Sequence, residues 1–597
     1  MKLKNVLASV ASLMLVLSPL NVYADDTVYA TDNNGNNYTS IESAWNAACN
    51  GVEITMQADW NLEDRLIVPD SAKAVVEMNG HRISRNLGDD TTNGEVLCLN
   101  DNSTLNLMGL NAPETEFSFK GYSRYNSTQD VSLTSGGLIT GGYSSNGGGG
   151  IHMKKGSSLN LSHIIVGGNK SEKSLQMDGN GGGICIDGDN TNCNFQYSYV
   201  AYNFADLNGG GIYSNSENSM IILTGSHINN NSTYCYTNYH TKNGGGLYID
   251  KDSTTLSMRD SEIKSNYAYG DGGGLFINGE YAKVSMDNSH IDENTSHEGG
   301  GININDTNCS IEMKNNSSIN KNKGSLGGGV YINYSYFSIQ SKDDTQNTIS
   351  ENTISASGAG IYINSNTLNS NSGEILGMII DSNVSGSYSE GTSMGGSNGG
   401  GLYINQENVL VKNCTITNNK CSHGGGVYID NDNVTFEDTT VTNNSSWNKW
   451  GSFYVSNTND ITLNGKIIIK NNEGKQSDLR GANHIGDGDL ELGEGDTMDS
   501  YIKGNLSSDS EIGLYMSNAR KIAIEQTSDN TSVFFFNYGI SHLEYNAEEQ
   551  AYYLVSGSAT SSIFGDGNTL IAGGVMLAVV VVGVVCLVVH KKKTTNN

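Results

Sequence analysis

The 597-residue chain is poor in proline, in basic residues and in closely paired cysteines. It has three prolines, Pro19, Pro69 and Pro113, and no L-P-x-T-G signal for covalent attachment to a cell wall. Asp and Glu total 63 against 34 Lys and Arg, which gives a formal net charge of -29. Nucleic acids and acidic polysaccharides bind to basic surfaces, so this balance argues against both as ligands.

The nine cysteines include no C-x-x-C pair and no neighbouring histidine at zinc-ligand spacing. We therefore expect no metal site and no cofactor. Cys185 with Cys193, and Cys414 with Cys421, could form local disulfides in an oxidising exterior. Free buried thiols that act as small hydrophobic side chains are an equally good interpretation.

Both ends of the chain carry apolar segments. Residues 1–24 combine Lys2 and Lys4, an apolar stretch and small residues at Val22 and Ala24, which predicts a secretory signal peptide. Leu570–Val589 has no charged residue and is long enough to span a bilayer, and three lysines follow at 591–593. Positive residues stay on the cytoplasmic side, so residues 590–597 are expected inside and the main body outside. These features predict a single-pass cell-membrane protein, as in a Gram-positive-type bacterium, retained by its helix.

A glycine motif recurs ten times in forms such as "NGGGLYID" and "GGGVYIN", at intervals of 25 to 41 residues. The last glycines are Gly150, Gly183, Gly211, Gly246, Gly274, Gly301, Gly329, Gly360, Gly401 and Gly426. A flexible linker would not keep this spacing. A phosphate-binding loop would not occur ten times, and no G-K-[ST] follows any copy.

A second motif, a β-branched residue followed by two variable residues and Asn, keeps step with the first. Its asparagines are Asn169, Asn203, Asn231, Asn266, Asn294, Asn322, Asn352, Asn419, Asn444 and Asn472, and around Val384 we expect Ser387 in this place. Short segments of alternating apolar and polar residues lie between the motifs, so we expect each repeat to contain about three short strands. One such unit cannot bury its own apolar face, but stacked copies can.

The expected fold is therefore an all-β, right-handed parallel β-helix with one coil per repeat, stacked at about 4.8 Å. Ile, Leu and Val fill the interior, asparagines form ladders at the turns, and glycines make tight corners. Residues 25–130 are expected to form an N-terminal cap and the first coils, with a helix in "YTSIESAWNAA" that places Ile41, Trp45 and Ala48 on one face. Residues 131–472 are expected to form the repeats, 473–556 a β-rich cap and 557–569 a spacer.

The paired motifs, between Ser144 and Asn472, resemble the repeats of polymorphic outer membrane proteins, with Gly in place of Ala and Ile or Val in place of Phe. More broadly, the chain is similar to the pectate-lyase-like superfamily, which contains enzymes and adhesins. The resemblance implies a β-helical stalk displayed at a cell surface.

No catalytic set stands out. Adjacent acids occur at Asp89-Asp90 and Asp343-Asp344, outside the regular strand positions, and Arg259 is the only arginine between residues 130 and 472. The histidines at turns are expected to be solvated surface residues; they are His163, His227, His290 and His423.

The second residue after most glycine motifs is aromatic. These residues are Tyr213, Tyr248, Phe276, Tyr331, Tyr362, Tyr403, Tyr428 and Tyr454, with His152, Cys185 and Asn303 as exceptions. Their flanking residues are apolar and would face the core, so the rings would point outward, one per coil. An exposed column could bind sugar rings or apolar protein surfaces. Alternatively, the rings could only stabilise neighbouring coils by stacking.

These observations favour a membrane-anchored adhesin or binding protein for a glycan or a host or neighbouring-cell surface protein. A glycoside hydrolase or lyase on the same scaffold, and a passive envelope spacer, are the alternatives. The longest insert, between Gly360 and Gly401, is a further candidate contact segment.

Overall fold

The computed structural model describes residues 27–88, 93–172, 179–234, 242–333, 336–343, 345–364, 372–385, 396–447, 451–456, 459–477, 483–487, 489–492, 501–514, 520–523, 531–536 and 541–556. The chain divides into two compact units. Unit 1 comprises Met1–Ser355 and Ala359–Asn364, and unit 2 comprises Ala356–Gly358 and Ser365–Asn597. Each unit is a parallel β-helix.

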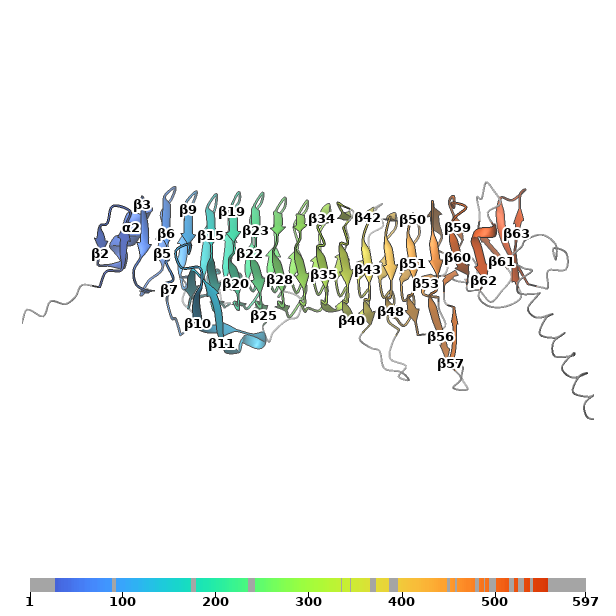
Figure 1. Ribbon diagram of the computed structural model, residues 1–597, viewed down its shortest axis with the longest axis horizontal. Coiled ribbons are helices and arrows are strands. Elements are labelled where there is room, and N and C mark those ends of the chain that lie inside the picture. The colour runs from blue at the N-terminus through green and yellow to red at the C-terminus, as the bar shows by residue number, and fades with distance from the viewer. Residues whose placement is uncertain are drawn as a thin grey trace, which may run out of the picture. The chain divides into compact units, whose positions relative to one another are not determined.

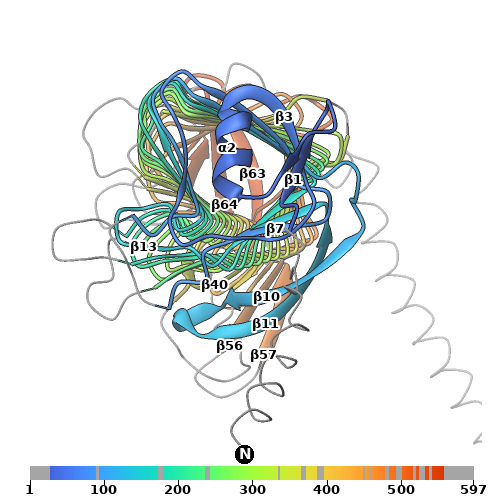
Figure 2. The ribbon, with the colours of Figure 1, turned by 90° about the vertical axis from the view of Figure 1, so that its left-hand side faces the viewer.

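Unit 1 begins with a helical cap. The only α-helix in the described ranges, α2 (Ile41–Cys49), starts at Ser40, whose hydroxyl accepts a hydrogen bond from the backbone of Ser43. Trp45 and Ala48 are buried as predicted, while Ile41 is half-buried. The Trp45 indole donates to the Ile67 carbonyl at 2.8 Å, which fixes the helix across the open end of the first coils (Figure 2). These coils contain β1 (Ala30–Asp32), β2 (Asn37–Tyr38), β3 (Asn50–Met56), β4 (Trp60–Asn61), β5 (Leu66–Val68), β6 (Lys73–Glu77) and β7 (Arg82–Ser84).

The strands of the later coils form three long rows and a shorter, interrupted fourth row, in which equivalent strands stack side by side (Figure 1). The glycine row follows the glycine motif and contains β8 (Leu97–Leu99), β14 (Ile151–Lys154), β18 (Ile184–Asp187), β22 (Ile212–Ser214), β26 (Leu247–Ile249), β30 (Leu275–Ile277), β33 (Ile302–Ile304), β37 (Val330–Asn333) and β41 (Ile361–Asn364). The second row contains β9 (Thr104–Met108), β15 (Ser158–Ser162), β19 (Asn192–Gln196), β23 (Met220–Thr224), β27 (Thr255–Arg259), β31 (Lys283–Asp287), β34 (Cys309–Lys314) and β38 (Phe337–Ser341).

The third row contains β12 (Gly137–Thr140), β16 (Ile164–Gly167), β20 (Tyr199–Ala201), β24 (His227–Asn229), β28 (Glu262–Lys264), β32 (His290–Asp292), β35 (Ser318–Asn320) and β39 (Thr348–Ser350). A short fourth row contains β13 (Tyr143–Ser144), β17 (Lys170–Ser171), β21 (Phe204–Ala205), β25 (Ser232–Thr233), β29 (Tyr267–Ala268) and β36 (Lys323–Leu326). An antiparallel hairpin, β10 (Thr115–Tyr122) and β11 (Thr128–Ser135), interrupts the repeats.

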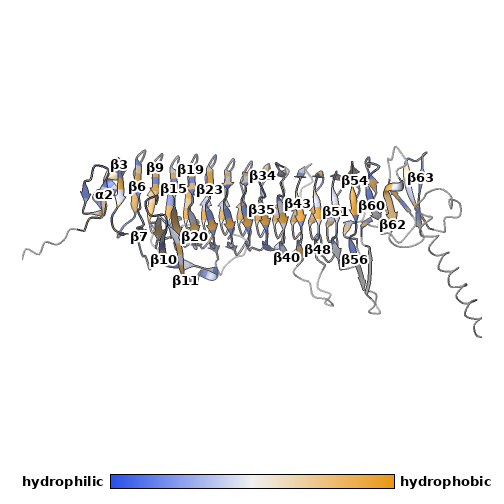
Figure 3. Ribbon diagram, in the orientation of Figure 1, coloured by the Kyte–Doolittle hydropathy of each residue, from blue (hydrophilic) through white to orange (hydrophobic). Residues whose placement is uncertain are grey.

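Strand alternation places the core as predicted. Leu247 and Ile249 of β26, Leu256 of β27 and Ile263 of β28 are fully buried, and each stacks on the equivalent residue of the next coil. Hydrophobic residues accordingly concentrate in the strands (Figure 3). Each coil buries only part of its own surface, so the stability of one repeat depends on its neighbours.

The glycine motif is a corner, as predicted. In "NGGG", Gly244 has a φ of +65°, which side chains with a Cβ rarely adopt. A Cβ on Gly245 would lie 2.6 Å from the carbonyl oxygen of Gly273 in the next coil, and one on Gly246 would lie 2.6 Å from that of Gly274. Coils can therefore stack at this corner only because side chains are absent.

The predicted asparagine ladder is present in both units. In unit 1 its members are Asn169, Asn203, Asn231, Asn266, Asn294, Asn322 and Asn352, all fully or almost fully buried. Asn266 is representative, since its Nδ2 donates to the Ile228 carbonyl at 2.7 Å and to Asn294 Oδ1 at 3.0 Å. Its Oδ1 accepts from the backbone and side chain of Asn231. The ladder thus satisfies polar groups that the corner would otherwise leave unpaired.

Unit 2 repeats the same plan. Its glycine row contains β45 (Leu402–Asn405), β49 (Val427–Ile429), β53 (Phe453–Val455) and β58 (Leu490–Leu492). Its second row contains β42 (Gly373–Leu376), β46 (Val409–Lys412), β50 (Val434–Glu437), β54 (Ile461–Asn464) and β59 (Ile502–Lys503). Its third row contains β43 (Ile379–Asp381), β47 (Thr415–Thr417), β51 (Thr440–Thr442), β55 (Ile468–Lys470) and β60 (Glu511–Leu514), and its fourth β44 (Val384–Ser385), β48 (Lys420–Cys421), β52 (Ser445–Ser446) and β56 (Glu473–Ser477).

Unit 2 also contains antiparallel elements. The strand β57 (Asn483–Asp487) forms a hairpin with β56, and β63 (Ser541–Asn546), β64 (Ala551–Ser556) and β61 (Arg520–Ala523) pair antiparallel near the end of the described chain, where β62 (Phe534–Phe536) also lies. The ladder of unit 2 runs through Asn383, Asn419, Asn444 and Asn472 to Asp489. The expectation that Ser387 takes the ladder position is wrong. The motif in this repeat is "IDSN", and its asparagine is Asn383.

The predicted signal peptide, the spacer and the predicted membrane span lie outside the described residues. Within the ranges that are described, no helix is long and apolar enough to cross a bilayer.

Candidate functional site

The aromatic residues after the glycine motif stack in register. In unit 1, Tyr213 pairs with Tyr248 and Tyr248 with Phe276, and Tyr331 pairs with Tyr362. The Tyr248 and Phe276 rings lie 5.0 Å apart at 13°, and those of Tyr331 and Tyr362 lie 5.3 Å apart at 6°. The flanking aliphatic residues face the core, as predicted.

The expectation that this column is exposed is wrong. Six of its eight members are buried, namely Tyr213, Tyr248, Phe276, Tyr331, Tyr403 and Tyr454, while Tyr362 and Tyr428 are half-buried. The rings are covered by the side chains in register on adjacent coils and by the glycine corners. A Cβ on Gly244, for example, would lie 2.7 Å from the Cβ of Tyr248.

The column is also tied down by its hydroxyl groups. Tyr213 and Tyr248 both donate to the Asp250 carboxylate, and in unit 2 Tyr403 donates to Asp430. Burial raises the pKa of Tyr428 in unit 2 to about 12. These geometries favour a stacking role and leave little ring surface for a ligand.

In the coils of unit 1 that precede the aromatic column, the equivalent position is held by Cys98, His152 and Cys185, which pair in register. His152 is buried, and its Nε2 lies 3.9 Å from the Asp187 carboxylate. Among the described residues, no group of three His, Cys, Asp or Glu side chains is placed to hold a metal ion.

The two possible disulfides do not form. Cys185, Cys193, Cys414 and Cys421 are all free and buried, so the interpretation as small hydrophobic side chains is confirmed. Burial raises the pKa of the Cys193 and Cys414 thiols to about 12 and that of Cys421 to about 11. Such thiols remain protonated and unreactive at neutral pH.

The four turn histidines were expected to be fully solvated, but all of them are half-buried. His163 stacks on Tyr197 and His227 stacks on Tyr199, at 5.2 and 4.7 Å. Burial lowers the pKa of His423, whose Nδ1 lies 2.9 Å from Asn398 Oδ1.

Of the adjacent acid pairs, Asp89, Asp90 and Asp344 lie outside the described residues. Asp343 accepts hydrogen bonds from Asn315, Thr345 and Asn347, so its carboxylate serves the turn around it.

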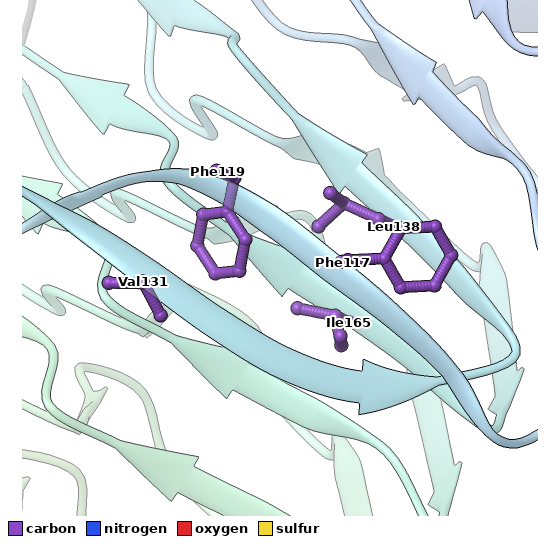
Figure 4. Packing of buried hydrophobic residues seen from close by; sticks show 5 residues of the cluster. All are labelled: Phe117, Phe119, Val131, Leu138 and Ile165. Carbon is purple, nitrogen blue, oxygen red and sulfur yellow. The ribbon is translucent and has the colours of Figure 1, made fainter.

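The hairpin β10–β11 is the feature of unit 1 that departs most from the repeat. Phe117, Phe119 and Val131 on its inner face pack against Leu138 and Ile165, which point outward from the third row (Figure 4). The hairpin lies outside the coil (Figure 2). It therefore adds a second layer over part of this row.

Small residues make room for the hairpin. A Cβ on Gly168 would lie 2.3 Å from the Lys120 carbonyl, and one on Gly167 would lie 2.9 Å from the Phe119 ring. Gly167 pairs with Ala201 in the next coil, whereas the following coils carry Asn229 and Lys264 at this position. The sequence interpretation missed the hairpin, although "VGGN" among bulkier copies and the alternation in "TEFSFKGY" were available signals.

The hairpin tip builds a cluster of aromatic and basic side chains, the tip cluster, formed by Arg124, Tyr125, Tyr234, Tyr267 and Tyr269. The Arg124 guanidinium lies 4.8 Å from the centre of the Tyr267 ring and donates to Thr295 Oγ1. Tyr125 meets Tyr234 edge to face at 4.9 Å, and Tyr234 meets Tyr269 in the same way at 4.9 Å. Cation–π and edge-to-face contacts thus hold the tip on the fourth row.

The tip forms a tight turn and is exposed. Tyr125 and Asn126 have φ values of +63° and +58°, the left-handed conformation that Tyr202 and Tyr281 also adopt at turns of this chain. Tyr125 is 56% exposed, although three neighbouring tyrosines are half-buried beside it.

No family model matches the sequence, and neither a curated protein nor a solved structure matches it. The class that the fold defines is a parallel β-helix solenoid of stacked repeats. The resemblance to polymorphic outer membrane protein repeats and to pectate-lyase-like proteins stays a prediction.

Proposed function

We propose that the protein is a cell-surface binding protein of the adhesin type, and that the tip cluster makes contact with its ligand. The observation that carries the proposal is the hairpin β10–β11, which places an exposed Tyr125 over a fixed group of aromatic rings. Tyrosine faces bind sugar rings and apolar protein surfaces at low entropic cost. The stacked coils supply a rigid support.

The proposal includes the topology predicted from the chain ends. A signal peptide at residues 1–24 exports the chain, and Leu570–Val589 anchors it in the membrane of a Gram-positive-type bacterium. We further propose that the coil is right-handed and pectate-lyase-like, because parallel crossover connections are almost always right-handed.

The binding role can be tested with beads coated with the full chain in a detergent that contains no sugar. The surfaces are xylan, a neutral β-glucan, polygalacturonate with calcium, and fibrous protein. We expect adhesion to at least one surface and its loss with Tyr125→Ser. The matched control is Tyr281→Ser, since Tyr281 is 53% exposed, has a φ of +58° and lies away from the tip.

Equal adhesion of the two variants would contradict the proposal. New reducing ends released from a polysaccharide would instead favour the glycoside hydrolase or lyase interpretation.

A further inference from the structure

The outward side of the third row in unit 1 carries a line of polar and aromatic side chains, the polar strip, formed by Tyr199, His227, Glu262, His290 and Ser318. These residues pair in register along successive coils. Neighbouring members are therefore separated by one coil rise, about 4.8 Å.

Internal contacts fix the strip but leave part of its hydrogen-bonding capacity unused. Tyr199 stacks on His227 at 14°, and His227 Nδ1 lies 3.5 Å from Glu262 Oε2. His290 Nδ1 lies 2.7 Å from Ser318 Oγ. Within the described ranges, no partner occupies Nε2 of either histidine or Oε1 of Glu262. The side chains of His227 and Glu262 are 26% and 35% exposed, so both are partly accessible to a ligand.

The third row has a second outward line of side chains, which includes Lys264 and Asp292. Its polar groups are more fully paired with other residues of the protein. Asp292 accepts from Ser318 Oγ and from the backbone of Asn320, and burial raises the pKa of this carboxyl group. Lys264 lies 3.4 Å from Glu293, which offsets its charge. Lys264 is therefore paired with a carboxylate and is not free to bind an acidic ligand.

The polar strip begins in the coil that follows the last coil covered by the hairpin. Ile165, which precedes Tyr199 in register, is buried under the hairpin, and Tyr199 packs at the margin of the same cluster. Tyr234 and Tyr267 of the tip cluster follow β24 and β28 in the chain, so the tip cluster lies beyond the C-terminal ends of two strands that carry the strip. The strip on the third row and the tip cluster on the fourth row are thus separated by the asparagine corner.

We infer that the ligand is an uncharged, extended polysaccharide that lies along the coil-stacking direction, with its hydroxyl groups on the polar strip and a sugar ring against the tip cluster. This inference rests on the proposed binding function. Carboxylate and imidazole groups bind paired hydroxyls, while aromatic faces cover the C–H faces of pyranose rings. The repeat of the strip, one polar group per coil, suits a polymer whose units advance by a similar distance.

Binding of the full chain to soluble xylan and to a neutral β-glucan, measured by calorimetry, tests the inference. Glu262→Ala is expected to weaken binding about tenfold or more, because a hydrogen bond from a ligand hydroxyl to the carboxylate is lost. The matched control is Glu312→Ala, an exposed glutamate on the second row whose carboxylate pairs with Lys342 at 3.1 Å. It should bind like the unchanged chain.

The outcomes separate this inference from the proposed function. If Tyr125→Ser abolishes binding while Glu262→Ala matches its control, the tip binds a ligand but the polar strip does not, and the inference is overturned. If polygalacturonate or a protein binds and neutral polysaccharides do not, the ligand class is wrong. If neither variant changes binding, the inference and the proposed function both fail.

Discussion

Substitution of Asn266 by Ala tests how the ladder holds the coils of unit 1 together. The Asn266 side chain is fully buried, donates two hydrogen bonds and accepts two. At a net value of about 1 kcal/mol for each bond, the free energy of unfolding should fall by about 4 kcal/mol. That is a large share of the roughly 5–15 kcal/mol that stabilises a typical folded domain. The backbone N–H of Asn231 would lose its acceptor, Asn266 Oδ1, and because this group is buried, water could not replace that acceptor.

The measurement is urea unfolding followed by far-UV circular dichroism. The matched control is Ser257→Ala, a half-buried outward position on β27 of the same coil, which should change the free energy by less than about 0.5 kcal/mol. If Asn266→Ala unfolds at the same urea concentration as Ser257→Ala, the ladder does not stabilise the coils and the reasoning is refuted.

Three further predictions concern the corner, the thiols and the histidines. Gly245→Ala should unfold at a much lower urea concentration than Gly88→Ala. A Cβ at residue 245 would clash with the next coil, whereas a Cβ at residue 88 would contact nothing. Equal urea midpoints for the two variants would contradict this prediction. The six buried cysteines, Cys98, Cys185, Cys193, Cys309, Cys414 and Cys421, should react with iodoacetamide only after denaturation, and mass spectrometry should find no disulfide among them. In an NMR titration, the pKa of His297 should lie above 6.5, because the imidazole bonds to Asp271, and the pKa of the half-buried His423 should lie below 6.5; the reverse order would show the pairing to be wrong. The His297 contribution to stability is full below pH 6.5 and is lost as the pH rises through its raised pKa, whereas the lowered pKa of His423 reduces stability as the pH falls below 6.5.

The repeat could be predicted from the sequence because its determinants are local. Gly244 marks a corner where a positive φ is needed, and Asn266 marks a ladder position, and both recur at a fixed place in each coil. Strand alternation then assigns Leu247 and Ile249 to the core. In a solenoid each repeat contacts mainly its neighbours, so a pattern read from one coil applies to the next.

The burial of the outward side chains could not be predicted in the same way. Alternation correctly places Tyr248 outside the core, but its burial depends on Tyr213, Phe276 and the glycine corner that cover it. Likewise, the tip cluster joins Tyr125 to Tyr267, which is 142 residues further along the chain. The strand period gives the direction of a side chain, whereas its exposure depends on three-dimensional neighbours.

The most direct test of the binding function is an equilibrium binding isotherm of the full chain with xylan and with a neutral β-glucan, measured for the unchanged protein, Tyr125→Ser and Tyr281→Ser. Saturable binding to at least one of the two polysaccharides that is lost with Tyr125→Ser and retained with Tyr281→Ser is the predicted result. Identical isotherms for the two variants would contradict the assignment of ligand contact to the hairpin tip.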